Sequence, residues 1–163
     1  MWLLVAIIGL FFANKSTETP FDPSGNLYYA SNQPDFENQV NKLLHSALNT
    51  PLKNVAVHIT SSKDCLCKLV ANRHIKSVKD MVKSIGKTNE TVFVEDIIGL
   101  SSILSSTPAI AIFDELGKLS YLGPYATGIG CFSGNGTVEP YLATRGTLGA
   151  IIPFESTGCY CHG

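Results

Sequence analysis

The sequence predicts an α/β domain with a central mixed sheet and flanking helices. Segments with apolar residues at helical spacing alternate with short apolar segments typical of buried strands. Two later apolar segments, Ala109–Asp114 and Lys118–Leu122, are joined by a short turn and predict an antiparallel hairpin. The chain has 163 residues, of which 45% are hydrophobic, so it is long enough for one such domain with an N-terminal appendage.

The first residues form an uninterrupted apolar segment, Trp2–Ala13. As a helix it would span about 18 Å, which is less than the ~30 Å hydrocarbon thickness; its length fits the hydrophobic region of a signal peptide better. Phe11 stands where a cleavage site after Ala13 would need a small residue. We therefore expect residues 1–13 to be an uncleaved signal anchor, with a buried strand or helix as the other interpretation. Residues 14–26 are expected to be a linker and residues 27–163 the domain.

The first helix and strand of the domain follow the linker. Apolar residues recur at helical spacing from Phe36 to Leu48, and Pro51 ends this helix. Asn54–Thr60 is short, β-branched and apolar except for His58, as a strand buried on both faces should be. We expect His58 to be a packed histidine.

Two cysteines, Cys65 and Cys67, stand directly before the second helix. Apolar residues repeat at helical spacing from Lys68 to Ile85, where Gly86 closes the segment. The cysteines are therefore predicted at a helix N-terminus. His45 and His74 fall on predicted helices and are expected at the surface.

The remaining elements follow in order. They are a strand at Thr91–Glu95, a short helix or turn at Asp96–Ser105, the hairpin with Gly117 as its bulge-type turn residue, a glycine-rich loop containing Cys131, a helix near Thr137–Arg145, and the tail Gly158-Cys159-Tyr160-Cys161-His162-Gly163.

This order of elements resembles that of the thioredoxin superfamily from about Gly25 to Arg145. Ser106-Thr107-Pro108-Ala109-Ile110 resembles the cis-proline segment of that superfamily. The resemblance implies a thioredoxin-like fold in which Thr107–Pro108 is a cis bond beside Cys65, so that Thr107 and Pro108 join the site.

A narrower resemblance is to an uncharacterised bacterial thioredoxin-like family of unknown function. It rests on the apolar N-terminus, Phe21-Asp22-Pro23, Asp64-Cys65-Leu66-Cys67, Leu122-Gly123-Pro124-Tyr125 and the terminal Gly-Cys-aromatic-Cys. The chain departs from thioredoxins in its cysteine spacing, since one residue, Leu66, separates Cys65 from Cys67.

The position of Cys65 and Cys67 favours thiol chemistry. A helix N-terminus stabilises a thiolate and lowers its pKa. We expect Cys65 to be the reactive thiol and Cys67 its nearest partner, in a disulfide that exchanges with other proteins. Inert buried thiols and permanent structural disulfides are the alternatives.

The other cysteines could join this pair. Cys131, Cys159 and Cys161 are candidate resolving or relay residues if the tail folds back, although the tail could equally extend away. Five cysteines cannot all pair within one chain. Alternatively these five cysteines and His162 hold copper or zinc, with copper preferred because the zinc spacing C-x2-4-C is absent.

The sequence therefore predicts a thiol-disulfide oxidoreductase tethered to the inner membrane, with its domain on the periplasmic side. The alternatives are a Cu(I)- or zinc-handling protein and a non-catalytic binding module. The expected partners are protein thiols or disulfides and, through the anchor, the membrane. A net charge of −1 disfavours nucleic acid as a partner. No cofactor is expected for the redox function.

Overall fold

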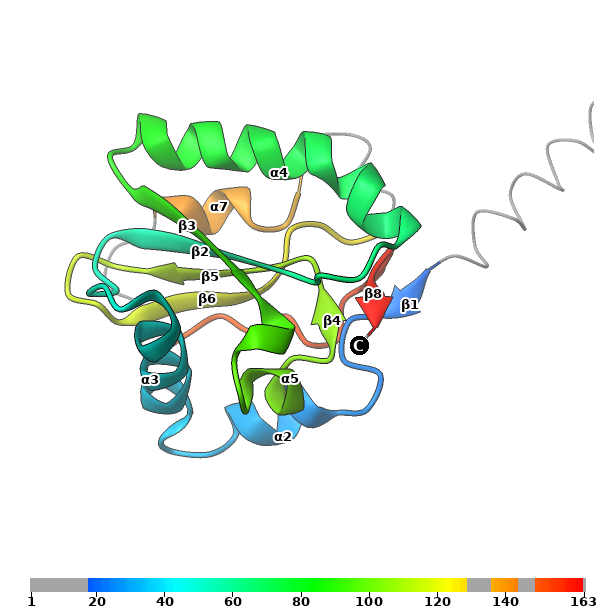
Figure 1. The fold of residues 1–163 in the computed structure, drawn as a ribbon, viewed down its shortest axis with the longest axis horizontal. Helices are drawn as coiled ribbons and strands as arrows, with labels where there is room; N and C mark the ends of the chain where they lie inside the picture. The colour runs from blue at the N-terminus through cyan, green and yellow to red at the C-terminus, as the bar shows by residue number, and fades with distance from the viewer. Residues whose placement is uncertain (1–17, 129–135, 144–148, 163) are drawn as a thin grey trace, which may run out of the picture.

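The computed structural model describes residues 18–128, 136–143 and 149–162 (Figure 1). The expected anchor at residues 1–13 and the candidate residue Cys131 lie outside the described residues. Within the described ranges, no helix is both long enough and apolar enough to span a bilayer.

A four-stranded mixed sheet forms the centre of the domain. Its strands are β2 (Val55–Thr60), β3 (Thr88–Phe93), β5 (Ala109–Phe113) and β6 (Leu119–Pro124). They lie in the order β3-β2-β5-β6. β2 is parallel to β3 and antiparallel to β5, which forms the antiparallel hairpin with β6. The prediction of an α/β domain with a mixed central sheet is therefore confirmed.

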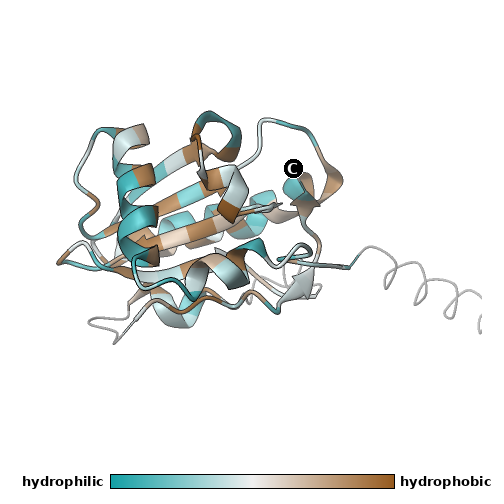
Figure 2. Cartoon of the chain, turned by 90° about the horizontal axis from the view of Figure 1, so that it is seen from below, coloured by the Kyte–Doolittle hydropathy of each residue, from teal (hydrophilic) through white to brown (hydrophobic). Residues whose placement is uncertain are grey.

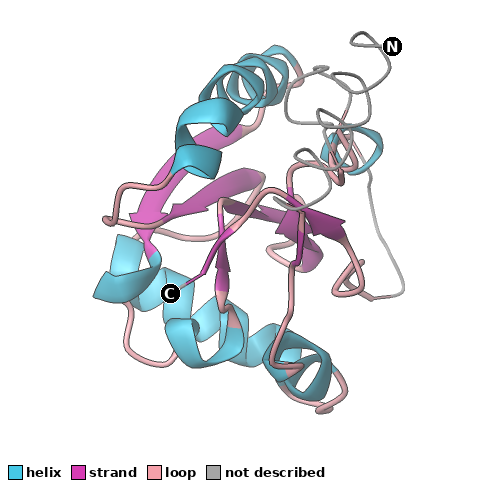
Figure 3. Ribbon diagram, turned by 90° about the vertical axis from the view of Figure 1, so that its right-hand side faces the viewer, coloured by secondary structure: helices cyan, strands magenta, loops and turns pink. Residues whose placement is uncertain are grey.

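Helices cover both faces of this sheet (Figures 1 and 3). Successive side chains of a strand point to opposite faces. Accordingly, Val55, Val57 and Ile59 of β2 pack in the core beneath α3 (Phe36–Leu48), while Ala56 packs with α4 (Leu66–Ser84). The first face also carries α2 (Asn26–Ser31), the 3-10 turn η1 (Val94–Asp96) and α5 (Leu100–Ile103), and the second carries α7 (Glu139–Leu142). Apolar residues accordingly run along the strands in Figure 2.

β3 and α7 are among the elements whose bounds differ from the prediction. β3 begins at Thr88 and ends at Phe93, whereas a strand was expected at Thr91–Glu95. As an edge strand, β3 pairs its backbone with β2 while its side chains remain largely exposed, so polar residues are tolerated at its start. Of the helix expected at Thr137–Arg145, Glu139–Leu142 forms α7, and residues 144 and 145 lie outside the described residues.

Residues 18–26, which we expected to belong to a linker, pack against the domain. β1 (Thr19–Pro20) pairs antiparallel with β7 (Thr157–Gly158) of the tail. The next residue, Phe21, is only 1% exposed and belongs to the main core. The carboxylate of Asp22 accepts the first free N–H groups of α2, from Leu27 at 3.1 Å and Tyr28 at 2.8 Å.

The histidine predictions are correct for two of three residues. His58 is buried in β2 and His45 is exposed on α3. The expectation of a surface position for His74 is wrong, because this residue is buried beneath α7 and its Nε2 lies 2.6 Å from the Glu139 carboxylate. The helical period of α4 places His74 on the same face as the core residues Ala71 and Val78.

Candidate site: a four-cysteine disulfide centre

The candidate site lies at the first turn of α4. As predicted, Cys65 is the residue that precedes the helix, with extended backbone angles, and Cys67 lies within the first turn. The first N–H groups of a helix have no partner within the helix, and the helix dipole places partial positive charge there. Sulfur at these positions is therefore placed where a thiolate is stabilised.

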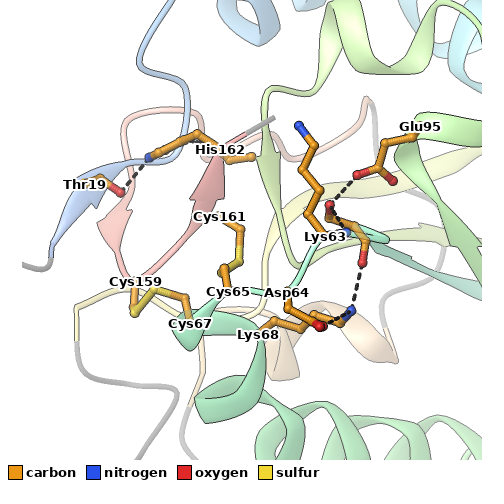
Figure 4. The surroundings of a disulfide bond; sticks show 12 residues. Thr19, Lys63, Asp64, Cys65, Cys67, Lys68, Glu95, Cys159, Cys161 and His162 are labelled. Atoms are coloured by element: carbon orange, nitrogen blue, oxygen red, sulfur yellow. Dashed lines mark hydrogen bonds and ion pairs between the residues drawn. A yellow bond between two sulfur atoms is a disulfide. The ribbon is translucent and has the colours of Figure 1, made fainter.

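Two nested disulfides join this helix turn to the tail (Figure 4). Cys65 is bonded to Cys161 with 6.2 Å between their Cα atoms, and Cys67 is bonded to Cys159 with 5.3 Å. The expectation that Cys67 would be the nearest partner of Cys65 is therefore wrong. Each cysteine of the helix turn is bonded to a cysteine of the tail, because the tail runs antiparallel across the turn and brings one C-x-C segment opposite the other.

A short β-ladder fixes this arrangement. β4 (Ser106–Thr107) pairs antiparallel with β8 (Cys161–His162), and Thr107 stands opposite Cys161. Cys161 is thus held twice, by the backbone of β4 and by the sulfur of Cys65. The Thr107–Pro108 bond is cis, as predicted.

Further contacts hold the tail on the domain. One ring nitrogen of His162 lies 2.9 Å from the Ser106 hydroxyl. The other lies 2.9 Å from the Thr19 hydroxyl (Figure 4). The Tyr160 side chain points into the domain, where its hydroxyl donates to the carbonyl of Ala126 at 2.9 Å. The tail therefore folds back onto the site, one of the two arrangements that the sequence left open.

Charged residues surround the loop before α4. Lys68 donates to the carbonyl of Ser61 at 2.9 Å and lies 3.8 Å from the carboxylate of Asp64, whose side chain is 99% exposed. Glu95 accepts hydrogen bonds from the Ser61 hydroxyl and the Ser62 N–H. Desolvation raises the pKa of Glu95, but these two hydrogen bonds and the charge of Lys63 oppose it, and the net shift of the pKa is downward. The loop is thereby fixed by an ionised carboxylate.

A cavity of about 290 Å³ lies between α4 and β3, with Lys68 and Pro108 in its wall. His58 and Tyr125 also line this cavity. Asn89 donates its amide N–H to the carbonyl of Lys79, which leaves its oxygen facing His58 Nε2 at 2.6 Å. His58 must therefore donate at Nε2, and its Nδ1 accepts the hydroxyl proton of Tyr125.

Burial keeps this histidine neutral. The pKa of His58 is lowered to about 4, chiefly by desolvation; the hydrogen bond to Asn89 acts in the opposite direction, and the charge of Lys79 contributes to the lowering. Burial also raises the pKa of Tyr125 well above its ordinary value. Both groups are uncharged at neutral pH, so the wall of the cavity nearest β2 is neutral.

In this oxidised form, the described residues that were predicted as metal ligands have other partners. Cys65, Cys67, Cys159 and Cys161 are held in disulfides, and both ring nitrogens of His162 have hydroxyl neighbours. Across the part of the chain that the structure describes, no group of three or more histidine, cysteine or acidic side chains stands ready to hold a metal. Thiolate ligands would arise here only on reduction of the disulfides.

The structure brings together most of the predicted site residues, namely Cys65, Cys67, Thr107, Cys159, Cys161 and His162. Three residues that hold the tail were not predicted: Thr19, Phe21 and Tyr160. An aromatic residue between two cysteines was the available signal for Tyr160. Phe21 was noted only within the motif Phe21-Asp22-Pro23, and Thr19 carried no signal, because both fall among the prolines and glycine of the expected linker.

The fold and site define a mixed α/β domain with a surface disulfide centre at a helix N-terminus. The family described as "Domain of unknown function (DUF6436)" matches residues 33–163, and the chain belongs to this family. Neither the curated proteins nor the solved structures yielded a match.

Proposed function

We propose that this protein is a thioredoxin-like thiol-disulfide oxidoreductase that exchanges disulfides with partner proteins through Cys65. The observation that supports this most is the Cys65–Cys161 bond at the start of α4, opposite β4. It joins a sulfur at a helix N-terminus to a cysteine held in an extended strand. This is the arrangement that a mixed disulfide with a partner polypeptide would have.

The exchange balances without a cofactor. In the reduced protein, the Cys65 thiolate attacks a partner disulfide, forms a mixed disulfide and releases one partner thiolate, which takes up a proton. The Cys161 thiolate then attacks Cys65, releases the second partner thiolate, which takes up a proton, and restores the Cys65–Cys161 disulfide of the oxidised structure. Two electrons pass from the protein to the partner, and the same intermediate serves the reverse direction. A dithiol reductant must first open the bonds to Cys159 and Cys161.

Trapping of the mixed disulfide tests this function. The variant that keeps only Cys65, with serine at the other four cysteine positions, lacks every resolving thiol, so after reduction and removal of the reductant it should accumulate a mixed disulfide at Cys65 when mixed with a disulfide-containing peptide. The matched variant that keeps only Cys67 should not. Mass spectrometry of the trapped species identifies the cysteine. Equal and slow reaction of all cysteines in both variants would exclude the function.

The alternative of copper handling is distinguished in the same preparations. Reduction places the thiols of two C-x-C segments at one site, and soft sulfur is the ligand that Cu(I) prefers. Stoichiometric Cu(I) bound by the reduced protein and lost in either variant, without trapped mixed disulfides, would assign the site to metal handling.

The proposed location is the periplasmic side of the inner membrane, with residues 1–13 as the tether. Two disulfides between distant parts of the chain suit an oxidising compartment. Alkaline phosphatase folds only outside the cytoplasm, because it needs its own disulfides. Fused after the tail, it should be active in cells, and an inactive but intact fusion would exclude this location.

A further inference from the structure

The tail occupies the domain in the way that a bound peptide would. Its backbone pairs with β1 through β7 and with β4 through β8. The N–H of Gly128 also donates to the carbonyl of Thr157 at 2.7 Å. These contacts use main-chain groups, so they would accept many sequences in an extended segment. The tail's side chains therefore indicate what the site selects.

One tail side chain is placed in a fitted subsite, that of Tyr160. Tyr160 is only 6% exposed and belongs to the main core cluster. Its ring meets the ring of Phe21 edge to face, with 5.1 Å between centroids. Its hydroxyl donates to the carbonyl of Ala126, a residue that is itself buried. Burial, an edge-to-face ring contact and a paired hydroxyl are what a tyrosine-binding subsite requires.

Gly158 contributes to the fit of this tyrosine. A Cβ atom at position 158 would lie 2.8 Å from the Tyr160 hydroxyl oxygen and 3.2 Å from the backbone nitrogen of Gly128. The segment before the aromatic residue must therefore pass close to its hydroxyl, and a side chain there would displace the ring.

The subsite lies beside the reactive sulfur. Tyr160 immediately precedes Cys161, which stands opposite Thr107 and is bonded to Cys65. We propose that the subsite formed by Phe21 and the Ala126 carbonyl recognises an aromatic side chain directly before the reactive cysteine of a partner's extended segment. The tail is then an internal occupant that a partner replaces. This inference rests on the proposed function of Cys65.

The replacement is a balanced thiol-disulfide exchange. In the oxidised protein, the partner thiolate attacks Cys65, a partner–Cys65 bond forms, the Cys65–Cys161 bond breaks and Cys161 leaves as a thiolate that takes up a proton. The aromatic side chain of the partner enters the subsite as Tyr160 leaves it. No outside oxidant or reductant is needed for this step.

Peptide variants test the subsite without altering the protein's core. The protein is the full-length chain that keeps Cys65 as its one cysteine, with serine at the other four positions. The probes are peptides with the sequence of residues 156–163, Cys159→Ser, and the remaining thiol activated as a 2-thiopyridyl disulfide. Three peptides carry Tyr, Phe or Ala at the position of Tyr160. Release of pyridine-2-thione gives the rate constant at Cys65.

We expect the rate constant at low peptide concentration to fall about tenfold or more from the Tyr to the Ala peptide, with Phe between them, because ring burial and the hydroxyl bond are lost in turn. The protein's own serine-substituted tail competes equally with all three peptides. The matched control is the chain that keeps only Cys67, whose tail partner is Cys159, and it should show little dependence on the aromatic residue.

Two results separate the inference from the function on which it rests. Equal rates for the Tyr and Ala peptides, with rapid reaction of Cys65 with 2,2′-dithiodipyridine, would overturn the subsite and leave the proposed function intact. Reaction of Cys65 with that small probe no faster than an unstructured cysteine peptide, in a chain whose cooperative urea transition shows that it is folded, would overturn the function. The Tyr-to-Ala ratio would then still decide whether the subsite exists.

Discussion

The nested disulfides should stabilise the domain in a strongly non-additive way. Cys65–Cys161 spans a sequence separation of 96 and Cys67–Cys159 spans 92, so each closes almost the same loop. In the chain-entropy account, the first bond to form across a loop of this size contributes about 4.7 kcal/mol to the free energy of unfolding. Once it exists, the second closes a ring of roughly five residues and adds only about 2 kcal/mol.

The perturbation is the removal of one or both bonds by paired serine substitutions. Loss of either pair alone should cost about 2 kcal/mol, because the other bond still closes the large loop, whereas loss of both should cost about 7 kcal/mol. The double loss therefore exceeds the sum of the single losses by about 3 kcal/mol.

Urea unfolding of the oxidised proteins, all on a Cys131→Ser background, measures these free energies. The same series under reducing conditions is the control, since differences that remain there report the packing of serine rather than loop closure. Costs that add to within about 0.5 kcal/mol, after this correction, would refute the reasoning.

Three further predictions concern the site and its support. The Cys67–Cys159 bond should be reduced before Cys65–Cys161, because Cys161 is only 8% exposed beside β4 while both cysteines of the other bond are partly exposed. Partial reduction followed by thiol labelling and mass mapping measures the order of reduction. A reversed order would contradict the placement of β8. Tyr125→Phe should lower the free energy of unfolding by about 1–3 kcal/mol, because His58 Nδ1 loses its buried donor, and an unchanged urea midpoint would exclude this bond. The folded pKa of His58, about 4, lies below the ordinary value of 6.5, so the contribution of neutral His58 to stability is complete above pH 6.5 and is lost as the pH falls toward 4. The loss reaches about 3 kcal/mol. His58→Gln should flatten the dependence of the free energy of unfolding on pH between 6.5 and 4, and parallel curves for the two proteins would contradict this prediction.

Local sequence patterns predicted the elements that depend on local forces. The apolar spacing of α3 gave its bounds, Phe36–Leu48, because one face of that helix packs on the sheet. The hairpin was predictable since Gly117 adopts the positive φ of 82° that its turn requires. The start of α4 at the cysteines was predictable for the same local reason, since helical spacing begins there.

Patterns of side chains did not predict contacts made by the backbone. β1, β4, β7 and β8 are two residues long each, and such strands show no alternation that a sequence could reveal. They exist because segments distant in the chain meet and pair their main-chain groups. The assignment of Thr19 and Phe21 to a linker failed for this reason.

The sequence by itself determined the local features of the candidate site: two C-x-C segments, one of them at a predicted helix N-terminus and the other in the tail. It could not determine which cysteines bond, because sulfur pairing depends on distances between residues separated by 92 or more positions. Only the tertiary structure decided that the tail crosses the helix turn antiparallel, with Tyr160 buried against Phe21 and Cys161 opposite Thr107. These contacts join residues that are far apart in the sequence and meet only in the folded chain. The pairing of the four cysteines and the burial of Tyr160 therefore follow from the fold.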